Sequence, residues 1–555
     1  MTDPSVRFDL RTEPWIPVID KTGAGVELGI RETLARSHEL RGIANASPLV
    51  EVALHRLLLA VLHRVVDGPR SPDDWQRLWV RGRFDEPAID AYLGRFADRF
   101  DLFGTERPFY QDAGLIAAGL RVSPIVKLAH EFASEGNAPL LFDHTVDGSF
   151  DPATAARYLV AHQVFSLGGT VTRTPGSTNP SAASGPSARA AHFRVSGTTL
   201  FETLTWNLVR YEPAADVPVP VIGEADLPAW ERAAAPTGAV RQPTGYLDVL
   251  TWQSDRVQLA APDADGAVTG AVIIAGDRID PGRELSVIEP TMLAFASRGS
   301  KAGPTQLREV RMSATRSLWR DSTVLIAVSG ADPGWRRPTV LDWAAELAWF
   351  GFGGLGETHL VPLEAGGLVG AKAKTLLWRR EGMSLPTAAL RDPARAEQIR
   401  IALRAAERIG AMLGDGTVDS AGADKGLPRP LARIAIALLG TKEHPPRPEA
   451  IRTFISGTGA APRYWSALST PFALLLNELA AADAAADPDA ERTAAVDHWA
   501  DAVRAAARDA FVRATSGFGG VTRALFAVAD GERAFNAGIA RVLGASHRPQ
   551  EVTPA

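Results

Sequence analysis

The sequence predicts an α+β protein with a large mixed α/β N-terminal domain, residues 1–384, followed by a C-terminal four-helix bundle, residues 385–555. A chain of 555 residues is too long for one hydrophobic core, since domains average roughly 150 residues. Strand-like and helical segments are mixed over about the first 380 residues. Beyond Leu385-Pro386 the pattern becomes alanine-rich and helical, which places the domain boundary near residue 385.

The first elements are short strands and turns over residues 1–45, followed by a helix. Ser47 is the expected N-cap of this helix, and Pro48 lies in its first turn. An apolar stripe runs along one face and consists of Leu54, Leu58, Val61, Leu62 and Val65. His55 and His63 flank the stripe, and no third metal ligand lies at a useful spacing. We therefore expect both to be core or surface histidines.

Residues 168–196 are expected to form a long irregular loop inside the first domain. They are rich in Gly, Pro, Ser and Thr and have almost no apolar periodicity. Loops of this length are usually functional or disordered. Strand-like runs return afterwards at Leu247–Trp252, Ala271–Ile274 and Thr323–Val328.

Four helical stretches are expected in the C-terminal region. Asp392-Pro393 and Asp487-Pro488 each combine an N-cap residue with a proline in the first turn, and each opens one helix. Two further stretches cover about Pro448–Ala480 and Val521–Leu543. Four helices of this length suit an antiparallel bundle.

The composition excludes several classes of protein. With 59 Lys+Arg and 64 Asp+Glu the net charge is −5, so any basic site for nucleic acid must be local. The chain has no cysteine, which excludes disulfides, thiolate metal sites and cysteine nucleophiles and fits a reducing cytoplasm. The start lacks a signal-peptide layout, and the most apolar stretch, Leu57 to Leu62, is far shorter than the ~18 residues that span a bilayer. We expect a cytoplasmic protein without a membrane segment.

No familiar catalytic signature is present, and no cofactor or metal site is expected. One pattern, Gly351-Phe-Gly353-Gly-Leu-Gly356, matches the dinucleotide fingerprint formally. That fingerprint needs a strand before it and a helix after it, whereas the preceding residues 341–350 are helix-like. The glycines are better explained as a helix stop and a turn. A dinucleotide-dependent enzyme remains only as an alternative.

Basic residues gather in three segments despite the acidic net charge. Between Arg298 and Arg320, six basic residues accompany a single acid, Glu309. The second segment holds Lys372, Lys374, Arg379 and Arg380, and the glycine-rich loop holds Arg173, Arg189 and Arg194. Such side chains neutralise phosphates, while glycine lets backbone N–H groups approach closely. The alternative interpretation is a set of solvated charged faces.

Five short segments, in this order, carry a resemblance to a known family: Leu10–Val18, Arg107–Gln111, Ser123–Leu128, Asn137–His144 and Ser317–Asp321. Together they resemble the large subunit (CasA type) of the type I-E CRISPR surveillance complex, Cascade. The resemblance implies a subunit without catalysis that reads the protospacer-adjacent motif (PAM) on double-stranded DNA and helps to open the duplex for the guide RNA. It also implies partnership with the CRISPR RNA, the other Cascade subunits and the helicase-nuclease that degrades the target.

The resemblance further implies that a glycine loop, a basic finger and a wedge probe the PAM from the minor groove. The glycine loop is assigned to Gly168, Gly169 and Thr170, which follow an expected helix at residues 152–164. The finger is usually a lysine about a dozen residues before an Asp/Glu/His-Pro pair. Here Glu289-Pro290 provides the pair and Arg278 the finger. Arginine keeps the charge but is planar and multidentate, so PAM tolerance can differ.

The wedge position departs from the family pattern, whereas one further loop matches it. The wedge position falls on Ala373, where a glutamine or similar side chain is expected. Alanine cannot fill a base-pair step, so either the register is off by one or a neighbouring lysine stem does the inserting. Lys372 and Lys374 are the candidates, with a solvated turn as the alternative. The loop that begins at Asn137 matches one that reaches toward the PAM, with Phe142 or Leu141 as its apolar contact or as core.

Two functions of other classes stay open. A helical scaffold subunit, whose basic clusters touch only protein, predicts that charge reversal at Arg278 leaves DNA binding unchanged. An enzyme that uses Gly351–Gly356 predicts saturable binding of a dinucleotide by the isolated chain.

Overall fold

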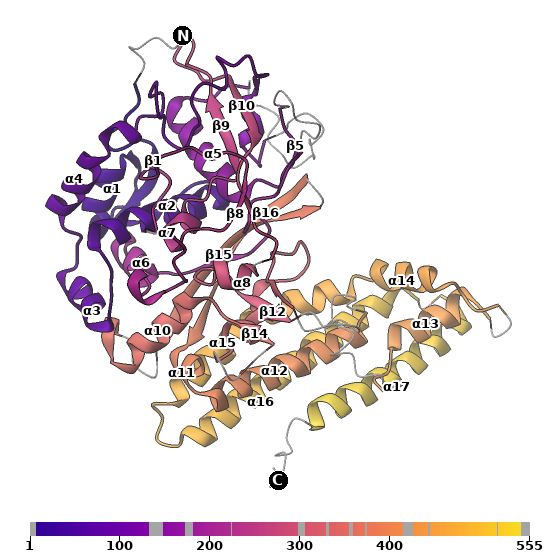
Figure 1. The fold of residues 1–555 in the computed structure, drawn as a ribbon. Helices are drawn as coiled ribbons and strands as arrows, with labels where there is room; N and C mark the ends of the chain where they lie inside the picture. The colour runs from indigo at the N-terminus through magenta and orange to yellow at the C-terminus, as the bar shows by residue number, and fades with distance from the viewer. Residues whose placement is uncertain are drawn as a thin grey trace. The chain divides into compact units, whose positions relative to one another are not determined.

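The computed structural model describes residues 7–132, 148–172, 181–223, 225–282, 284–297, 306–328, 332, 334–354, 359–371, 374–414, 426–441, 444–518 and 520–545. The chain divides into two compact units. Unit 1 consists of Met1–Ala314, Ala327–Leu355 and Val361–Met383, and unit 2 of Thr315–Ile326, Gly356–Leu360 and Ser384–Ala555. Strands and helices are mixed in unit 1, whereas the C-terminal part of unit 2 is helical (Figure 1), which confirms the α+β class.

The strands of unit 1 form several small sheets. The first has the order β2-β1-β3, with β1 at Ile16–Asp20, β2 at Gly25–Leu28 and β3 at Leu40–Ile43. The second has the order β4-β10-β9 (Ser123–Pro124, Gly270–Ala275, Asp255–Leu259), and a parallel pair joins β11 (Arg278–Ile279) to β8 (Val240–Arg241). The others are β13-β12-β14 (Leu307–Glu309, Phe295–Ser297, Trp335–Arg336), β16-β15-β7 (Lys374–Pro386, Leu360–Ala371, His192–Val195) and β5-β6 (Gly169–Thr170, Ser181–Ala182).

Helix α2 (Pro48–Val66) is the centre of unit 1. Its N-cap is the expected one, because Ser47 Oγ accepts a hydrogen bond from the backbone N–H of Val50 at 3.4 Å. The expected single apolar stripe is too narrow, since every residue from Pro48 to His63 is buried. Helices pack around α2 on several sides: α4 (Glu86–Arg95), α5 (Pro152–Phe165), α6 (Leu200–Asn207) and α7 (Tyr246–Leu250). A helix that is buried all round is typical of a protein core.

The remaining helices of unit 1 are α1 (Ile30–Ala35), α3 (Pro72–Arg81), α8 (Leu285–Ile288) and α10 (Thr339–Trp349). Of the three strand-like runs, only residues 271–274 form a strand, within β10. The prediction was wrong at residues 247–252, which begin within α7, and at residues 323–328, which begin within α9 (Ser322–Leu325). Short apolar runs have no period long enough to separate a buried strand from a buried helical turn.

The irregular loop expected at residues 168–196 has more structure than predicted. It contributes β5, β6 and β7, and β7 pairs antiparallel with β15, for example Val195 with Leu363. Ala188, Ala190 and Ala191 are buried. Segments of two to four strand residues are too short to show periodicity, so the sequence pattern could not reveal them.

The four helical stretches expected in the C-terminal region are present, with two differences. They are α12 (Pro393–Met412), α14 with α15 (Pro448–Gly457 and Ala460–Ala482), α16 (Pro488–Thr515) and α17 (Thr522–Ala545). The third stretch is broken where Gly459 adopts φ +64°, and two helices were not expected, α11 (Thr387–Arg391) and α13 (Pro430–Leu439). Asp392 and Asp487 cap α12 and α16 through their carboxylates, as predicted. Helix α15 packs on α16, and α13 packs on α17.

Unit 2 also includes residues 315–326, which are separated from residues 384–555 by two segments of unit 1, residues 327–355 and 361–383. The buried guanidinium of Arg320 forms an ion pair with Glu407 of α12 at 2.8 Å and lies 3.6 Å from the centre of the Trp465 ring. Trp319 stacks on Phe472 with a ring-centre distance of 4.7 Å. These contacts explain the Ser317–Asp321 segment as part of the core of the helical unit. Among the described helices, none is both long and apolar enough to cross a membrane.

Candidate nucleic-acid interface

The expected glycine loop follows α5 and has the backbone that only glycine adopts easily. Gly168 has φ +69° and Gly169 has φ +108°, both in the left-handed region. A Cβ on Gly168 would lie 2.6 Å from the carbonyl oxygen of Ala182, so no side chain fits there. Gly169 and Thr170 form β5, and Thr170 is exposed. Both glycines are half-buried, and Gly168 packs closely against the backbone of residues 182–184.

Arg278 is the first residue of β11 and is held by its backbone rather than by its side chain. Its backbone N–H donates to the carbonyl of Ala239 at 2.8 Å. Its side chain is exposed, and the guanidinium makes no ion pair with any residue that the structure describes. The preceding Asp277 is buried, and its Oδ1 accepts hydrogen bonds from the backbone N–H groups of residues 237–239 at 3.0 to 3.2 Å. A fixed strand thus carries a cation that is available to a ligand.

Arg241 on the neighbouring strand β8 is neutralised within the protein. Arg241 Nε donates to Asp277 at 2.6 Å, and its Nη1 donates to Asp248 at 2.6 Å. The Arg241 guanidinium also lies 4.0 Å from the centre of the Trp252 ring, and Arg232 pairs with Asp248 at 2.8 Å. Burial, the largest single cause, raises the pKa of Asp277, but the hydrogen bond and charge of Arg241 together with the backbone hydrogen bonds outweigh it and hold the pKa below its usual value. These paired charges stabilise β8 and β11 without competing for an external anion.

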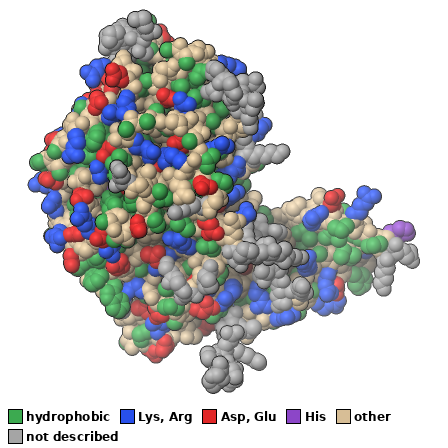
Figure 2. All heavy atoms as spheres, viewed as in Figure 1, with side chains coloured by type: hydrophobic (Ala, Val, Ile, Leu, Met, Phe, Trp, Pro, Cys, Tyr) green, Lys and Arg blue, Asp and Glu red, His purple; other side chains and the backbone are tan. Residues whose placement is uncertain are grey.

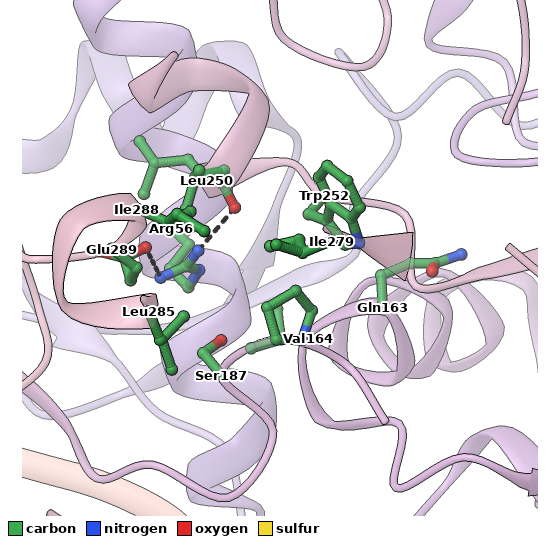
Figure 3. A pocket seen from close by; sticks show the side chains of 12 residues that line it. Arg56, Gln163, Val164, Ser187, Leu250, Trp252, Ile279, Leu285, Ile288 and Glu289 are labelled. Atoms are coloured by element: carbon green, nitrogen blue, oxygen red, sulfur yellow. Dashed lines mark hydrogen bonds and ion pairs between the residues drawn. The ribbon is translucent and has the colours of Figure 1, made fainter. Parts of the chain in front are cut away.

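A small pocket of about 10 Å³ lies in unit 1, between the end of α5 and the chain around β11 (Figure 3). Val164, at the end of α5, and Ile279, the neighbour of Arg278, both line it, together with Trp252. Residues 164 and 279, which are far apart in sequence, therefore meet at this pocket.

The same pocket holds a buried ion pair that anchors the Glu289-Pro290 pair used to locate the finger. Arg56 Nη1 lies 2.9 Å from Glu289 Oε2, and Arg56 Nη2 donates to the carbonyl of Val249 at 2.8 Å (Figure 3). The side chains of Arg56 and Glu289 are 3% and 1% exposed, so neither can contact DNA. Glu289 is thus a structural landmark, which fixes the segment after Arg278 to α2.

Buried titratable side chains lie behind the glycine loop. His162 Nε2 is 2.9 Å from Asp255 Oδ2, and the rings of His130 and His162 stack with centres 6.0 Å apart. Burial lowers the pKa of His130 to about 3 and raises the pKa of the neighbouring Glu131 to about 7. No sequence motif pointed to this cluster, because its members are contributed by separate elements.

The raised pKa of Glu131 predicts a pH-dependent stability. In the unfolded chain Glu131 loses its proton near its ordinary pKa of 4.5, whereas the folded chain keeps it to about 7. The contribution of Glu131 to the free energy of unfolding is therefore complete below pH 4.5. As the pH rises from there to about 7, about 3 kcal/mol of that free energy is lost. We therefore compare the free energies of unfolding of Glu131→Gln and the parent by denaturant unfolding at about pH 5 and about pH 8. The variant should become more stable relative to the parent by about that amount between the two pH values. The same difference in stability between variant and parent at both pH values would contradict this. Titration of the buried histidines affects both proteins equally and cancels in the comparison.

The predicted histidines are confirmed as core residues. His55 Nδ1 lies 2.7 Å from the carbonyl of Glu51, and His63 Nδ1 lies 3.0 Å from that of Gly68. Burial lowers the pKa of His55 to about 3 and that of His63 to about 4, so both are neutral near pH 7. In the part of the chain that the structure describes, no cluster of three or more His, Asp or Glu residues could hold a metal ion.

Comparison with known proteins identifies the family. A family model described as CRISPR-associated protein Cse1 matches residues 9–510. The chain belongs to this family. The CasA/Cse1 protein of Thermus thermophilus is 34% identical over 548 residues, which cover 97% of each protein. The resemblance carried by the five sequence segments is thereby confirmed.

Solved Cse1 structures have the same fold. A crystal structure of Thermus thermophilus CasA matches with a TM-score of 0.77 at 32% identity, over 97% of this chain and 100% of that one. Cse1 of Acidimicrobium ferrooxidans matches with a TM-score of 0.76 at 27% identity, over 98% of this chain and 100% of that one. Coverage of nearly both whole chains means that unit 1 and unit 2 each have counterparts in Cse1.

Of the three wedge candidates, the structure describes Lys374 alone. β15 ends at Ala371 and β16 begins at Lys374, and the two strands are adjacent in the sheet. Lys374 is exposed and makes no ion pair with a described residue. Lys372 and Ala373 lie outside the described residues, as do Asn137, Leu141 and Phe142 of the loop expected to reach the PAM.

Most of the described arginines of the basic segments are ion-paired within the protein, so their charge is largely neutralised there. Arg194 is buried and pairs with Glu364, Arg380 pairs with the buried Glu51 at 3.0 Å, and Arg316 pairs with Glu407 at 3.0 Å. Lys and Arg side chains are also interspersed with Asp and Glu on the face of unit 1 that Figure 2 shows. The carboxylate partners are distant in sequence, 170 residues away for Arg194, so a local charge count could not find them.

The dinucleotide alternative is contradicted by the order of elements. The glycines of residues 351–354 follow the helix α10, and the next described strand is β15, which reverses the strand-loop-helix order that the fingerprint requires. Gly353 has φ +66°, and a Cβ there would lie 2.6 Å from the Trp206 ring and 2.9 Å from that of Trp75. Close packing against two tryptophans explains this glycine.

Proposed function

We propose that this Cse1-family chain is the large subunit of a type I-E Cascade complex and reads the PAM on double-stranded DNA. The proposal rests on one observation above all: unit 1 holds a glycine pair whose backbone leaves no room for a side chain at Gly168, and an exposed arginine, Arg278, that makes no ion pair with a described residue. Backbone groups and a cation at fixed separation suit the minor groove, whose hydrogen-bond pattern is degenerate and whose edges are narrow. In this arrangement Gly168 and Gly169 approach base edges while Arg278 binds a base or phosphate.

Opening of the duplex belongs to the same proposal. Lys374, with Lys372 beside it, inserts its stem at the step next to the PAM. Unstacking such a step costs about a few kcal/mol, which pairing of the guide RNA seed with the target strand offsets. The chain contributes binding and positioning rather than catalysis.

The partners follow from the complex. A chain entitled CRISPR RNA-guided surveillance complex matches with a TM-score of 0.70 at 23% identity, over 96% of this chain, which supports the fold. On this proposal the protein assembles in the cytoplasm with the CRISPR RNA and the other Cascade subunits, and it helps to recruit the helicase-nuclease. Since those subunits supply most phosphate contacts, an acidic net charge of −5 is compatible with local DNA recognition.

The first test is a gel-shift with a guide-loaded complex that lacks its large subunit. The full-length chain is added, and a PAM library first selects the preferred motif. We expect addition of the chain to tighten binding to the PAM-bearing duplex and to leave binding to a scrambled duplex weak. Equal binding of both duplexes across the whole library would reject PAM recognition.

A further inference from the structure

Asp255 lies beneath the glycine loop and is connected to it by two successive hydrogen bonds. Asp255 is the first residue of β9 and is 1% exposed. Its Oδ2 accepts a hydrogen bond from Ser166 Oγ at 2.8 Å, and Ser166 Oγ in turn accepts one from the N–H of Gly168 at 3.4 Å. His162 Nε2, one turn earlier on α5, lies 2.9 Å from the same carboxylate oxygen. A single buried oxygen therefore fixes the exit of α5 from which the glycine pair starts.

The backbone of Asp255 is clamped to α5 as well. Gln163 Oε1 accepts from the N–H of Asp255 at 3.0 Å, and Gln163 Nε2 donates to the Asp255 carbonyl at 2.9 Å. Ser254 Oγ donates to the carbonyl of Gln163 at 2.6 Å. Buried hydrogen bonds of this kind hold two elements at one separation, since breaking them leaves polar groups unpaired.

The other side of Asp255 leads to Arg278. Asp255 pairs with Ala275, the last residue of β10, and Arg278 follows three positions later. Between them Gly276 passes so close to β9 that a Cβ there would lie 2.6 Å from the Ser254 carbonyl oxygen. The short connection from β10 to β11 is therefore seated on the residues that hold α5. Asp255 is therefore connected to the glycine loop through Ser166 and to the strand that leads to Arg278 through its pairing with Ala275.

We propose that Asp255 is a positioning residue for PAM discrimination: it fixes the separation between Gly168–Gly169 and Arg278 without touching DNA. This inference rests on the proposed function. Two contacts can test one base step together only when their spacing is fixed to within a fraction of an ångström, and buried supporting residues provide such precision. Loss of the support weakens the response to the correct motif while leaving non-specific attraction to phosphates unchanged.

Variants of the full-length chain in the reconstituted complex test this. The measured quantity is the ratio of affinities for the PAM-bearing and scrambled duplexes. We expect Asp255→Ala and Ser166→Ala to lower that ratio about tenfold, without a change in affinity for the scrambled duplex. Asp255→Asn should keep most of the ratio, because its amide oxygen replaces Oδ2 and its NH₂ takes the place of Oδ1, which has no hydrogen-bond partner among the described residues.

Ser37→Ala is the matched control. Ser37 is fully buried in unit 1 and its hydroxyl makes one hydrogen bond, to the Leu34 carbonyl at 2.8 Å. Ser37→Ala removes a buried serine hydroxyl just as Ser166→Ala does. Thermal unfolding should therefore report similar losses of stability for the two variants. If Asp255→Ala does not fold, this serine pair decides alone: equal discrimination ratios for Ser37→Ala and Ser166→Ala would overturn the proposal.

A double-mutant cycle with Arg278→Ala separates positioning from general destabilisation. If Asp255 acts through the finger, the two substitutions are not additive, because Arg278 has little left to contribute once it is misplaced. Additive effects on the ratio would overturn the inference. An Arg278→Ala variant that leaves the ratio unchanged would instead reject the proposed function. A ratio lowered by Arg278→Ala but not by Asp255→Ala or Ser166→Ala would reject this inference alone.

Discussion

Charge reversal at Arg278 is expected to remove most of the PAM-dependent affinity. A specific contact of an arginine to a base or phosphate contributes about 1–3 kcal/mol, and glutamate adds repulsion from the phosphates, so we expect Arg278→Glu to weaken binding to the PAM-bearing duplex about 30-fold. The side chain is exposed and makes no ion pair with a described residue, so folding should not suffer. Equilibrium binding by the reconstituted complex measures the change.

Arg83→Glu serves as the control for this experiment, since it changes the net charge by the same amount. Arg83 is exposed in the connection between α3 and α4 and is not one of the family-matched positions. The complex with Arg83→Glu should bind the PAM-bearing and the scrambled duplex with affinities close to those of the parent complex. Equal loss in the two variants would mean that only net charge matters, and unchanged PAM binding by Arg278→Glu would favour a scaffold that contacts protein alone.

The elements that could be predicted from the sequence are those with local causes. Ser47, Asp392 and Asp487 cap their helices because the side chain and the N–H groups that it bonds are a few residues apart. The glycine pair after α5 and Arg278 can be placed by their order along the chain, and their role at DNA stays a prediction. Helix α13 and the strands β5 to β7 are short and depend on tertiary contacts, so no local pattern indicated them.

The site residues that could not be predicted act through distant partners. Ser166 and His162 reach Asp255 across 89 and 93 residues of sequence, and nothing in the spacing of these residues suggests a network. The same is true of the charge clusters, in which Arg320 finds its carboxylate 87 residues away. A basic run in a sequence therefore indicates a phosphate site only once the acidic residues that pack against it in the fold are known. In this protein, Arg278 and Lys374 are cations that make no ion pair with a described residue.

The largest expected effect on stability is at Glu289. Glu289→Ala leaves Arg56 as a buried cation, 3% exposed, whose Nη1 has lost its carboxylate. Breaking one partner of a buried pair costs about 3–5 kcal/mol, because the remaining charge is neither solvated nor paired. Hydrogen exchange in α2 peptides should report a loss of this size in the free energy of opening. Peptides of α16 in unit 2 should keep their protection, which distinguishes loss of the pair from collapse of the whole chain.

Removal of both charges tests the reason for that loss. Arg56→Leu combined with Glu289→Leu takes away the uncompensated cation and fills the pocket with apolar volume, so we expect it to recover more than half of the stability. Recovery should be incomplete, because the buried Val249 carbonyl loses its 2.8 Å hydrogen bond from Arg56 and keeps only a longer one, from the N–H of Trp252 at 3.4 Å. A double variant as unstable as Glu289→Ala would show that packing around the pocket, and not the stranded charge, determines the effect. PAM discrimination by the recovered double variant then reports whether the pocket must hold an ion pair, or only its shape, to keep Ile279 and Val164 in place.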